Sequence, residues 1–150
     1  MQYINKYHSN FGLRATTKII LLFAFLIFSF ESDAQNTTIK SVKAQCIRAL
    51  KSNDIESFVS TFSNPVDISL PDNENSYSKT QAKVVMKGFL KNNKTKAFKV
   101  KQSGKSTGGS EFVIANLSTV NNKKYQIYIL FTISDGNANV HMVEFELLDE

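Results

Sequence analysis

His141 is the only histidine that follows residue 34, and histidine is the side chain best suited to carry protons near neutral pH. It falls on a predicted strand, at the same alternating positions as Val143, Phe145 and Leu147. That phase is apolar, so it predicts an imidazole that points inward. The sequence shows no partner for this histidine, and we therefore favour a structural or edge-exposed role.

The other residue types that support catalysis or metal binding are too few or wrongly spaced. Cys46 is the only cysteine, and one cysteine with one histidine falls short of a zinc ligand set. No acidic cluster has the spacing of a calcium loop. Gly104 to Gly109 reads GKSTGG, but the glycine that a phosphate-binding loop needs five residues earlier is Lys99. We therefore assign no catalytic residue, metal ion or cofactor.

Nine lysines and no acidic residue occur from Lys79 to Lys105. Lys79, Lys83, Lys87 and Lys91 recur every four residues on one face of a predicted helix, where like charges cost about 0.2–0.5 kcal/mol per pair. This lysine face suits an anionic partner, such as a membrane surface or an acidic glycan. We favour a merely solvated face, because runs of one charge are common on protein surfaces. The run lacks arginines and interleaved aromatic residues, which argues against a nucleic-acid partner.

A signal peptide is the clearest functional feature of the sequence. Ile19–Phe30 is a run of twelve uncharged residues, preceded by an arginine and a lysine and followed by Ser32-Asp33-Ala34. The run is shorter than the roughly 20 residues that cross a bilayer. We expect residues 1–34 to be removed and residues 35–150 to be exported to the periplasm or the cell exterior, without a transmembrane segment.

Residues 35–150 have the size of one domain that buries its own core. Subtracting the three basic and two acidic residues of the leader from the totals leaves 15 Lys+Arg and 11 Asp+Glu, a net charge of +4. Cys46 has no second cysteine to pair with, and it stands at helical spacing with Ile39, Val42 and Leu50. We therefore predict a buried thiol.

The predicted elements place helices first and strands last. Amphipathic spacing, with Asn53 and Ser78 as N-caps, predicts three helices: Thr38–Ser52, Asn53–Phe62 and Ser78–Asn92. Pro71–Ser76 is predicted to be a polar loop. Alternating apolar residues predict five strands: Val66–Leu70, Phe98–Lys101, Glu111–Val120, Lys123–Ser134 and Val140–Leu148. This order describes an α+β fold, in which three N-terminal helices pack on one face of an antiparallel sheet.

The strand Lys123–Ser134 carries apolar residues on both faces. One face holds alternate residues from Tyr125 to Ile133, and the other is half apolar through Tyr128 and Leu130. A sheet with one solvated face should have a polar second set. We therefore expect the second face to be partly covered, most simply by a second copy of the domain in a homodimer.

Four segments together resemble a known family: Ala49–Phe62, Tyr77–Ala82, Phe98–Lys105 and Tyr125–Tyr128. They are similar to a bacterial family of unknown function found in Bacteroidota, of the nuclear transport factor 2-like superfamily. The resemblance implies a cystatin-like cone, in which helices cup a curved sheet. The chain departs from the pattern at Gln102, where a histidine is expected.

The same resemblance implies a pocket at the wide end of the cone. Candidates for its lining are Phe58, Phe62, Phe89, Phe112, Tyr128 and His141. We favour a non-catalytic domain that binds a small hydrophobic ligand there, or a partner through the lysine face. The superfamily's enzymes hold a base and a proton donor inside the cone, so the alternative is a small isomerase- or lyase-like enzyme using His141 with Tyr128. If phenylalanine side chains fill the space, an interaction domain remains.

Overall fold

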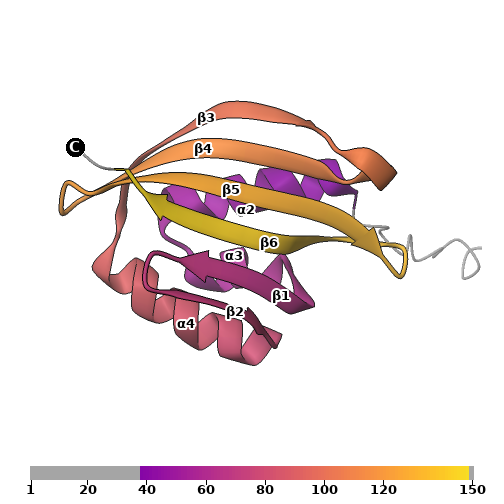
Figure 1. Ribbon diagram of the computed structural model, residues 1–150, viewed down its shortest axis with the longest axis horizontal. Coiled ribbons are helices and arrows are strands. Elements are labelled where there is room, and N and C mark those ends of the chain that lie inside the picture. Colours follow the sequence, from indigo (N-terminus) through magenta and orange to yellow (C-terminus); the bar gives the residue numbers. More distant parts are fainter. Residues whose placement is uncertain (1–37, 149–150) are drawn as a thin grey trace, which may run out of the picture. The chain divides into compact units, whose positions relative to one another are not determined.

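A computed structural model describes residues 38–148 as three helices packed against one curved sheet (Figure 1). The helices come before a four-stranded meander, which confirms the α+β fold expected from the sequence. In chain order the elements are α2 (Ile39–Ser52), α3 (Ile55–Ser60), β1 (Phe62–Leu70), β2 (Asn73–Tyr77), α4 (Lys79–Asn92), β3 (Thr95–Lys105), the short 3-10 helix η1 (Thr107–Gly109), β4 (Glu111–Thr119), β5 (Lys124–Ser134) and β6 (Asn137–Leu147).

Side-chain caps set the ends of the helices. The predicted capping box of Ser78 and Gln81 opens α4. The predicted N-cap at Asn53 is wrong, because Asn53 ends α2 in the left-handed conformation (φ 58°) and Asp54 caps α3. The Asn53 side chain accepts a hydrogen bond from the Thr95 N–H and donates one to the Thr95 carbonyl. It therefore ties the corner between α2 and α3 to the start of β3.

The six strands form one sheet in the order β2–β1–β6–β5–β4–β3. Neighbouring strands run antiparallel except β1 and β6, which are parallel, so the expectation of a purely antiparallel sheet is wrong at this pair. The predicted loop before α4 also contains an edge strand, β2, paired with β1 alone. Sequence patterns miss β2 because its residues are polar and exposed, except the half-buried Tyr77.

The helices cover one face of the sheet, here called the inner face. Alternate residues of β5 from Tyr125 to Phe131 are buried there, in one core with Ile39, Val42 and Leu50 of α2. Cys46 belongs to the same core and is fully buried, which confirms the predicted buried thiol. Burial raises the pKa of that thiol to about 12.

A bulge in β6 changes which side chains face the core. Pairing with β5 slips between Val140 and Met142, so His141 is an extra residue in the strand. The buried residues Val140 and Val143 are therefore three positions apart instead of two. His141 is exposed, and the inward orientation expected from simple alternation is corrected.

Candidate functional site

The face of the sheet that turns away from α2 and α3, here called the outer face, carries no helix among the described residues (Figure 1). Its centre is apolar, although its side chains alternate with the buried residues of β4, β5 and β6. Five half-buried residues form this apolar stripe: Phe112, Ile114, Tyr128, Leu130 and Met142. The sequence indicates apolar residues on both faces of β5. The structure shows that β4 and β6 also carry apolar residues on both faces.

Aromatic packing orders one end of the apolar stripe. The rings of Phe112 and Tyr128 stack, with centroids 6.1 Å apart and planes at 18°. Gly104 of β3 pairs with Phe112, and a Cβ built on this glycine would stand 2.9 Å from the phenylalanine ring. The absence of a side chain at Gly104 therefore makes room for the Phe112 ring.

Charges of opposite sign flank the apolar stripe. On the side of β6, β1 and β2 lie four carboxylates: Asp67, Glu74, Glu144 and Glu146. On the opposite side β3 carries Lys99, which is exposed, and Lys101, the extra residue of a bulge. Strand pairing connects Lys99 through Asn116 and Gln126 to Glu146, so one row across the sheet carries both signs. The outer face has an acidic side and a basic side.

The acidic side contains two adjoining grooves, which share Ser69 and Glu74. The first, about 400 Å³, is lined by residues that include Asp67, Glu74 and Met142. The second, about 610 Å³, is lined by residues that include Glu74, Glu144 and Glu146. Both are open and rich in carboxylates, so they suit cationic groups better than a buried apolar ligand.

His141 lies at the edge of this acidic side. Its Nε2 atom stands 3.9 Å from Asp67 Oδ2, beyond hydrogen-bond distance, and the two side chains are 49% and 42% exposed. The pair was not indicated by the sequence, because it depends on the β6 bulge and on the parallel pairing of β1 with β6. An exposed imidazole beside one carboxylate lacks the enclosed setting of a general base.

The six candidates for a pocket lining do not converge on one cavity. Phe58 and Phe62 are 0% and 1% exposed, and their rings pack edge to face with centroids 4.8 Å apart. Phe89 packs in the same manner against Tyr125 and Phe145. These three phenylalanines fill space between helices and sheet, whereas Phe112 and Tyr128 lie on the outer face and His141 lies at the bulge.

Two members of the lysine face are engaged within the fold. The Lys79 ammonium donates hydrogen bonds to the carbonyls of Ser60 and Phe62, at 2.8 and 3.1 Å. Lys83 forms an ion pair with Glu56 of α3, at 2.7 Å. Lys87 and Lys91 are exposed and form no ion pair within residues 38–148. The regular spacing in sequence thus overstates the number of lysines available to a partner.

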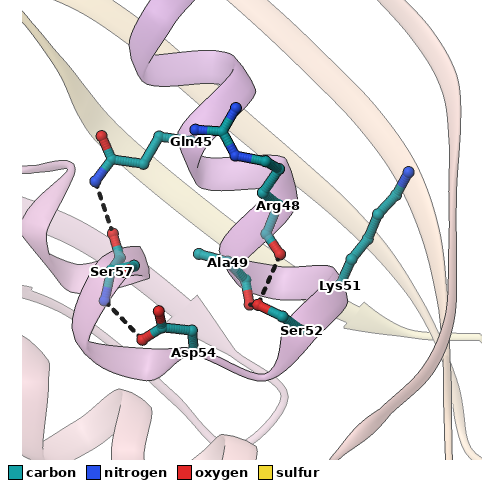
Figure 2. A pocket seen from close by; sticks show the side chains of 7 residues that line it. All are labelled: Gln45, Arg48, Ala49, Lys51, Ser52, Asp54 and Ser57. Carbon is teal, nitrogen blue, oxygen red and sulfur yellow. Dashed lines mark hydrogen bonds between the residues drawn. The ribbon is translucent and has the colours of Figure 1, made fainter.

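Sequence reasoning also missed a groove of about 520 Å³ between α2 and α3 (Figure 2). Gln45 donates to the Ser60 hydroxyl at 2.9 Å and to the Ser57 carbonyl at 3.4 Å. The Ser57 side chain and backbone donate to Asp54 and hold the pKa of that carboxyl below its ordinary value. Lys51 extends away from this cluster in Figure 2. The polar groups here mainly satisfy one another and hold α2 against α3.

The described residues offer neither a metal cluster nor a membrane span. Within residues 38–148, no group of three or more His, Cys, Asp or Glu residues is arranged to hold a metal ion. In the same range, no helix has the length and the apolar character that a bilayer crossing requires.

The sequence matches a known protein family. The sequence profile of a domain of unknown function, DUF4783, matches residues 43–146. The chain belongs to the DUF4783 family. No curated protein matches it. The family resemblance read from the sequence is therefore confirmed, and the family carries no assigned activity.

Solved structures confirm the fold of this DUF4783 domain. A DUF4783 protein from Bacteroides uniformis is 24% identical, with a TM-score of 0.66 over 71% of this chain and 97% of that one. One from Bacteroides ovatus is 22% identical, with a TM-score of 0.65 over 71% and 96%. An NTF2-like protein of unknown function from Cytophaga hutchinsonii is 12% identical, with a TM-score of 0.55 over 75% and 91%. These likenesses place the domain in the nuclear transport factor 2-like fold.

Proposed function

We propose that this DUF4783 domain is an exported, non-catalytic interaction domain that binds through the outer face of its sheet. The observation that carries the proposal is the apolar stripe, a contiguous set of half-buried side chains on a face without a helix. Contiguous exposed apolar surface on a soluble domain is characteristic of interaction sites. Export follows from the leader predicted in residues 1–34.

A surface site is better supported than an internal ligand pocket. The phenylalanines expected to line the pocket are packed against one another and against the sheet. The three grooves described above are lined by other residues and are open. A small apolar ligand prefers a concave site that encloses most of its surface. The outer face instead suits a flat macromolecular partner.

The enzyme alternative, with His141 as base and Tyr128 as donor, has weaker support. His141 stands at the β6 bulge beside Asp67, whereas Tyr128 pairs with Glu144 and stacks on Phe112. Acid–base catalysis needs both groups within reach of one substrate, in a site that limits water. Neither condition is favoured by two side chains on an open face.

The partner that the sequence already suggests is a second copy of the domain. An isologous dimer would cover the apolar stripe of both copies at once. We expect native protein lacking Met1–Ala34, as measured by intact mass, to sediment as a dimer at high micromolar concentration. A mass that retains the leader would contradict export, and a strict monomer would contradict self-association.

Two matched substitutions locate the surface. Leu130→Glu places a carboxylate in the apolar stripe and should convert the dimer to a folded monomer. Val84→Glu makes the same kind of change on α4, where Val84 is 70% exposed, and should leave the dimer unchanged. Sedimentation velocity reads the association and circular dichroism reads the fold. A dimer that survives Leu130→Glu but not Val84→Glu would move the interface to the helices.

A further inference from the structure

We infer that two copies pack outer face to outer face about a two-fold axis parallel to the strands. In this arrangement Lys99 and Lys101 of each copy enter the acidic grooves of the other copy. The inference rests on the proposed function, since it specifies how the outer face meets a second copy. It is carried by the distribution of charge across the sheet and by the position of the grooves.

The two signs of charge lie on opposite sides of the apolar stripe. Lys99 and Lys101 stand on β3, the edge strand beside β4. Glu144 and Glu146 stand on β6, and the other carboxylates of the acidic side lie on β1 and β2. None of the two lysines and two glutamates forms an ion pair within residues 38–148. The face is therefore complementary to itself only in some orientations.

Symmetry selects among those orientations. A two-fold axis parallel to the strands places the basic side of one copy over the acidic side of the other. It leaves the position along the strand direction unchanged, so each row of paired residues faces the same row of the partner copy. Lys99 shares a row with Glu146, so this axis brings Lys99 over the partner's Glu146. Gln102 shares a row with Glu144, and Lys101, the bulge residue next to Gln102, has a side chain long enough to reach the partner copy's Glu144. An axis across the strands would instead place β3 over β3, with lysine against lysine, which costs free energy.

The grooves provide space for the lysine side chains. The larger groove is lined by Glu144 and Glu146, together with Asp72 and Glu74 from the β1–β2 hairpin. Its volume of about 610 Å³ exceeds what a single lysine side chain needs, so two can enter. Each lysine would then be opposed by more than one carboxylate, in a setting less hydrated than either free surface.

The overlapping part of the face suits a weak, reversible interface. This axis superposes the four strands β3 to β6, which span roughly 14 Å at a spacing of about 4.8 Å, and the 11-residue strands β5 and β6 are about 36 Å long. The overlap of about 500 Å² is smaller than the about 800 Å² that each partner contributes to a standard interface, so we expect a dimer that forms at micromolar concentrations. Sheets that pack face to face cross at about 30°, so the strands of the two copies would be nearly aligned. The apolar stripe lies nearest the axis, which passes between β4 and β5, so Tyr128 stands opposite the partner copy's Ile114.

Two charge-reversal variants test the arrangement. Lys99→Glu/Lys101→Glu makes both sides acidic, and Glu144→Lys/Glu146→Lys makes both basic. Each alone should raise the dimer dissociation constant at least about tenfold. An equimolar mixture should form a heterodimer of near wild-type affinity, because each contact regains opposite charges. Native mass spectrometry distinguishes the heterodimer, and sedimentation velocity measures its affinity.

Controls separate this inference from the proposed function. Lys87→Glu/Lys91→Glu makes the same change of charge on α4 and should leave the dissociation constant unchanged. A monomeric wild type would defeat the proposed function itself. A dimer that dissociates with Leu130→Glu but ignores both charge reversals would overturn only the arrangement. A heterodimer between wild type and Lys99→Glu/Lys101→Glu that is tighter than either homodimer would place β3 over β3, and so overturn it too.

Discussion

The inner and outer faces of β5 are made by the same strand and differ in what covers them. On the inner face, Ile127, Ile129 and Phe131 are fully buried beneath the helices. On the outer face, Tyr128 and Leu130 are only half buried, by their neighbours in the sheet. Both sets of side chains are apolar, so the sequence pattern predicts that both faces of β5 are buried. Within residues 38–148, helices cover β5 on the inner side only.

The two faces also treat charge differently. The rim of the inner face pairs Lys43 of α2 with Glu111 of β4, and its centre holds the uncharged thiol of Cys46. The outer face keeps lysines and glutamates apart, on opposite sides of the apolar stripe. Charges paired within a fold are already satisfied, whereas segregated charges remain available to a partner. The charges at the rim of the inner face therefore stabilise the domain, whereas those of the outer face are available to the partner that we propose.

The largest expected contrast is in the cost of deleting a phenylalanine from each face. Phe58→Ala should lower the free energy of unfolding by about 3–5 kcal/mol, because Phe58 is 0% exposed. Phe112→Ala should lower it by about 1 kcal/mol, mainly through the lost stack on Tyr128. Urea unfolding at protein concentrations too low for dimers measures both.

If Phe58→Ala fails to fold, Phe58→Leu provides a milder deletion at the same position and should still cost more than Phe112→Leu. Equal losses at the two positions would break the comparison, because they would mean that the outer face is as tightly packed as the core. Phe112→Ala should in turn weaken self-association, which Phe58→Leu should leave unchanged.

The second contrast concerns the alkaline stability of the inner face. The pKa of Cys46 rises from an ordinary value of 9.0 to about 12 in the folded protein. Between these values the unfolded chain loses a proton that the folded chain keeps, so the free energy of unfolding falls as pH rises. The Cys46 contribution is fully present below pH 9.0 and is lost toward pH 12, by at most about 1.4 kcal/mol per pH unit.

Cys46→Ala should remove that part of the alkaline decline, although it lowers stability at neutral pH by leaving a small cavity. Urea unfolding of both proteins from neutral pH upward gives the two slopes. A thiol reagent should label native Cys46 only as fast as the domain opens. Rapid labelling of the native protein, with equal slopes in the two proteins, would show that the thiol is not held in the core.

Much of the inner face could be predicted from the sequence, because its side chains meet others from the same chain. The spacing of Val42, Cys46 and Leu50 gave the buried side of α2, and Ser78 with Gln81 gave the start of α4. These features are local, or depend on a period that secondary structure fixes. Asn53 shows the limit of local reasoning, since the same side chain suits an N-cap and a left-handed C-cap.

The outer face was predictable only in part. Tyr128 and Leu130 indicate a second apolar side of β5, whereas the family resemblance places His141 and Phe112 in a pocket inside the cone. The bulge at His141 changes the phase of the buried positions, from Ala138 and Val140 to Val143 and Phe145. The apolar pattern alone does not show which residue between Val140 and Val143 is the extra one. The acidic side depends on the pairing of β1 with β6, which joins strands far apart in sequence. Register of this kind is set by tertiary packing.

The smallest contrast is at Gly104, where the outer face has its own packing requirement. Alanine usually stabilises a strand by about 0.5–1 kcal/mol relative to glycine. Here its Cβ would stand 2.9 Å from the Phe112 ring, so the ring must move and its stack on Tyr128 must loosen. We expect Gly104→Ala to be neutral or slightly destabilising in the wild type. In a Phe112→Ala background the obstruction is gone, and the same change should stabilise by about 0.5–1 kcal/mol. Urea unfolding of the four proteins completes the double-mutant cycle. An equal gain in both backgrounds would mean that Phe112 moves freely, and the apolar stripe would then lack the fixed shape that recognition of a partner requires.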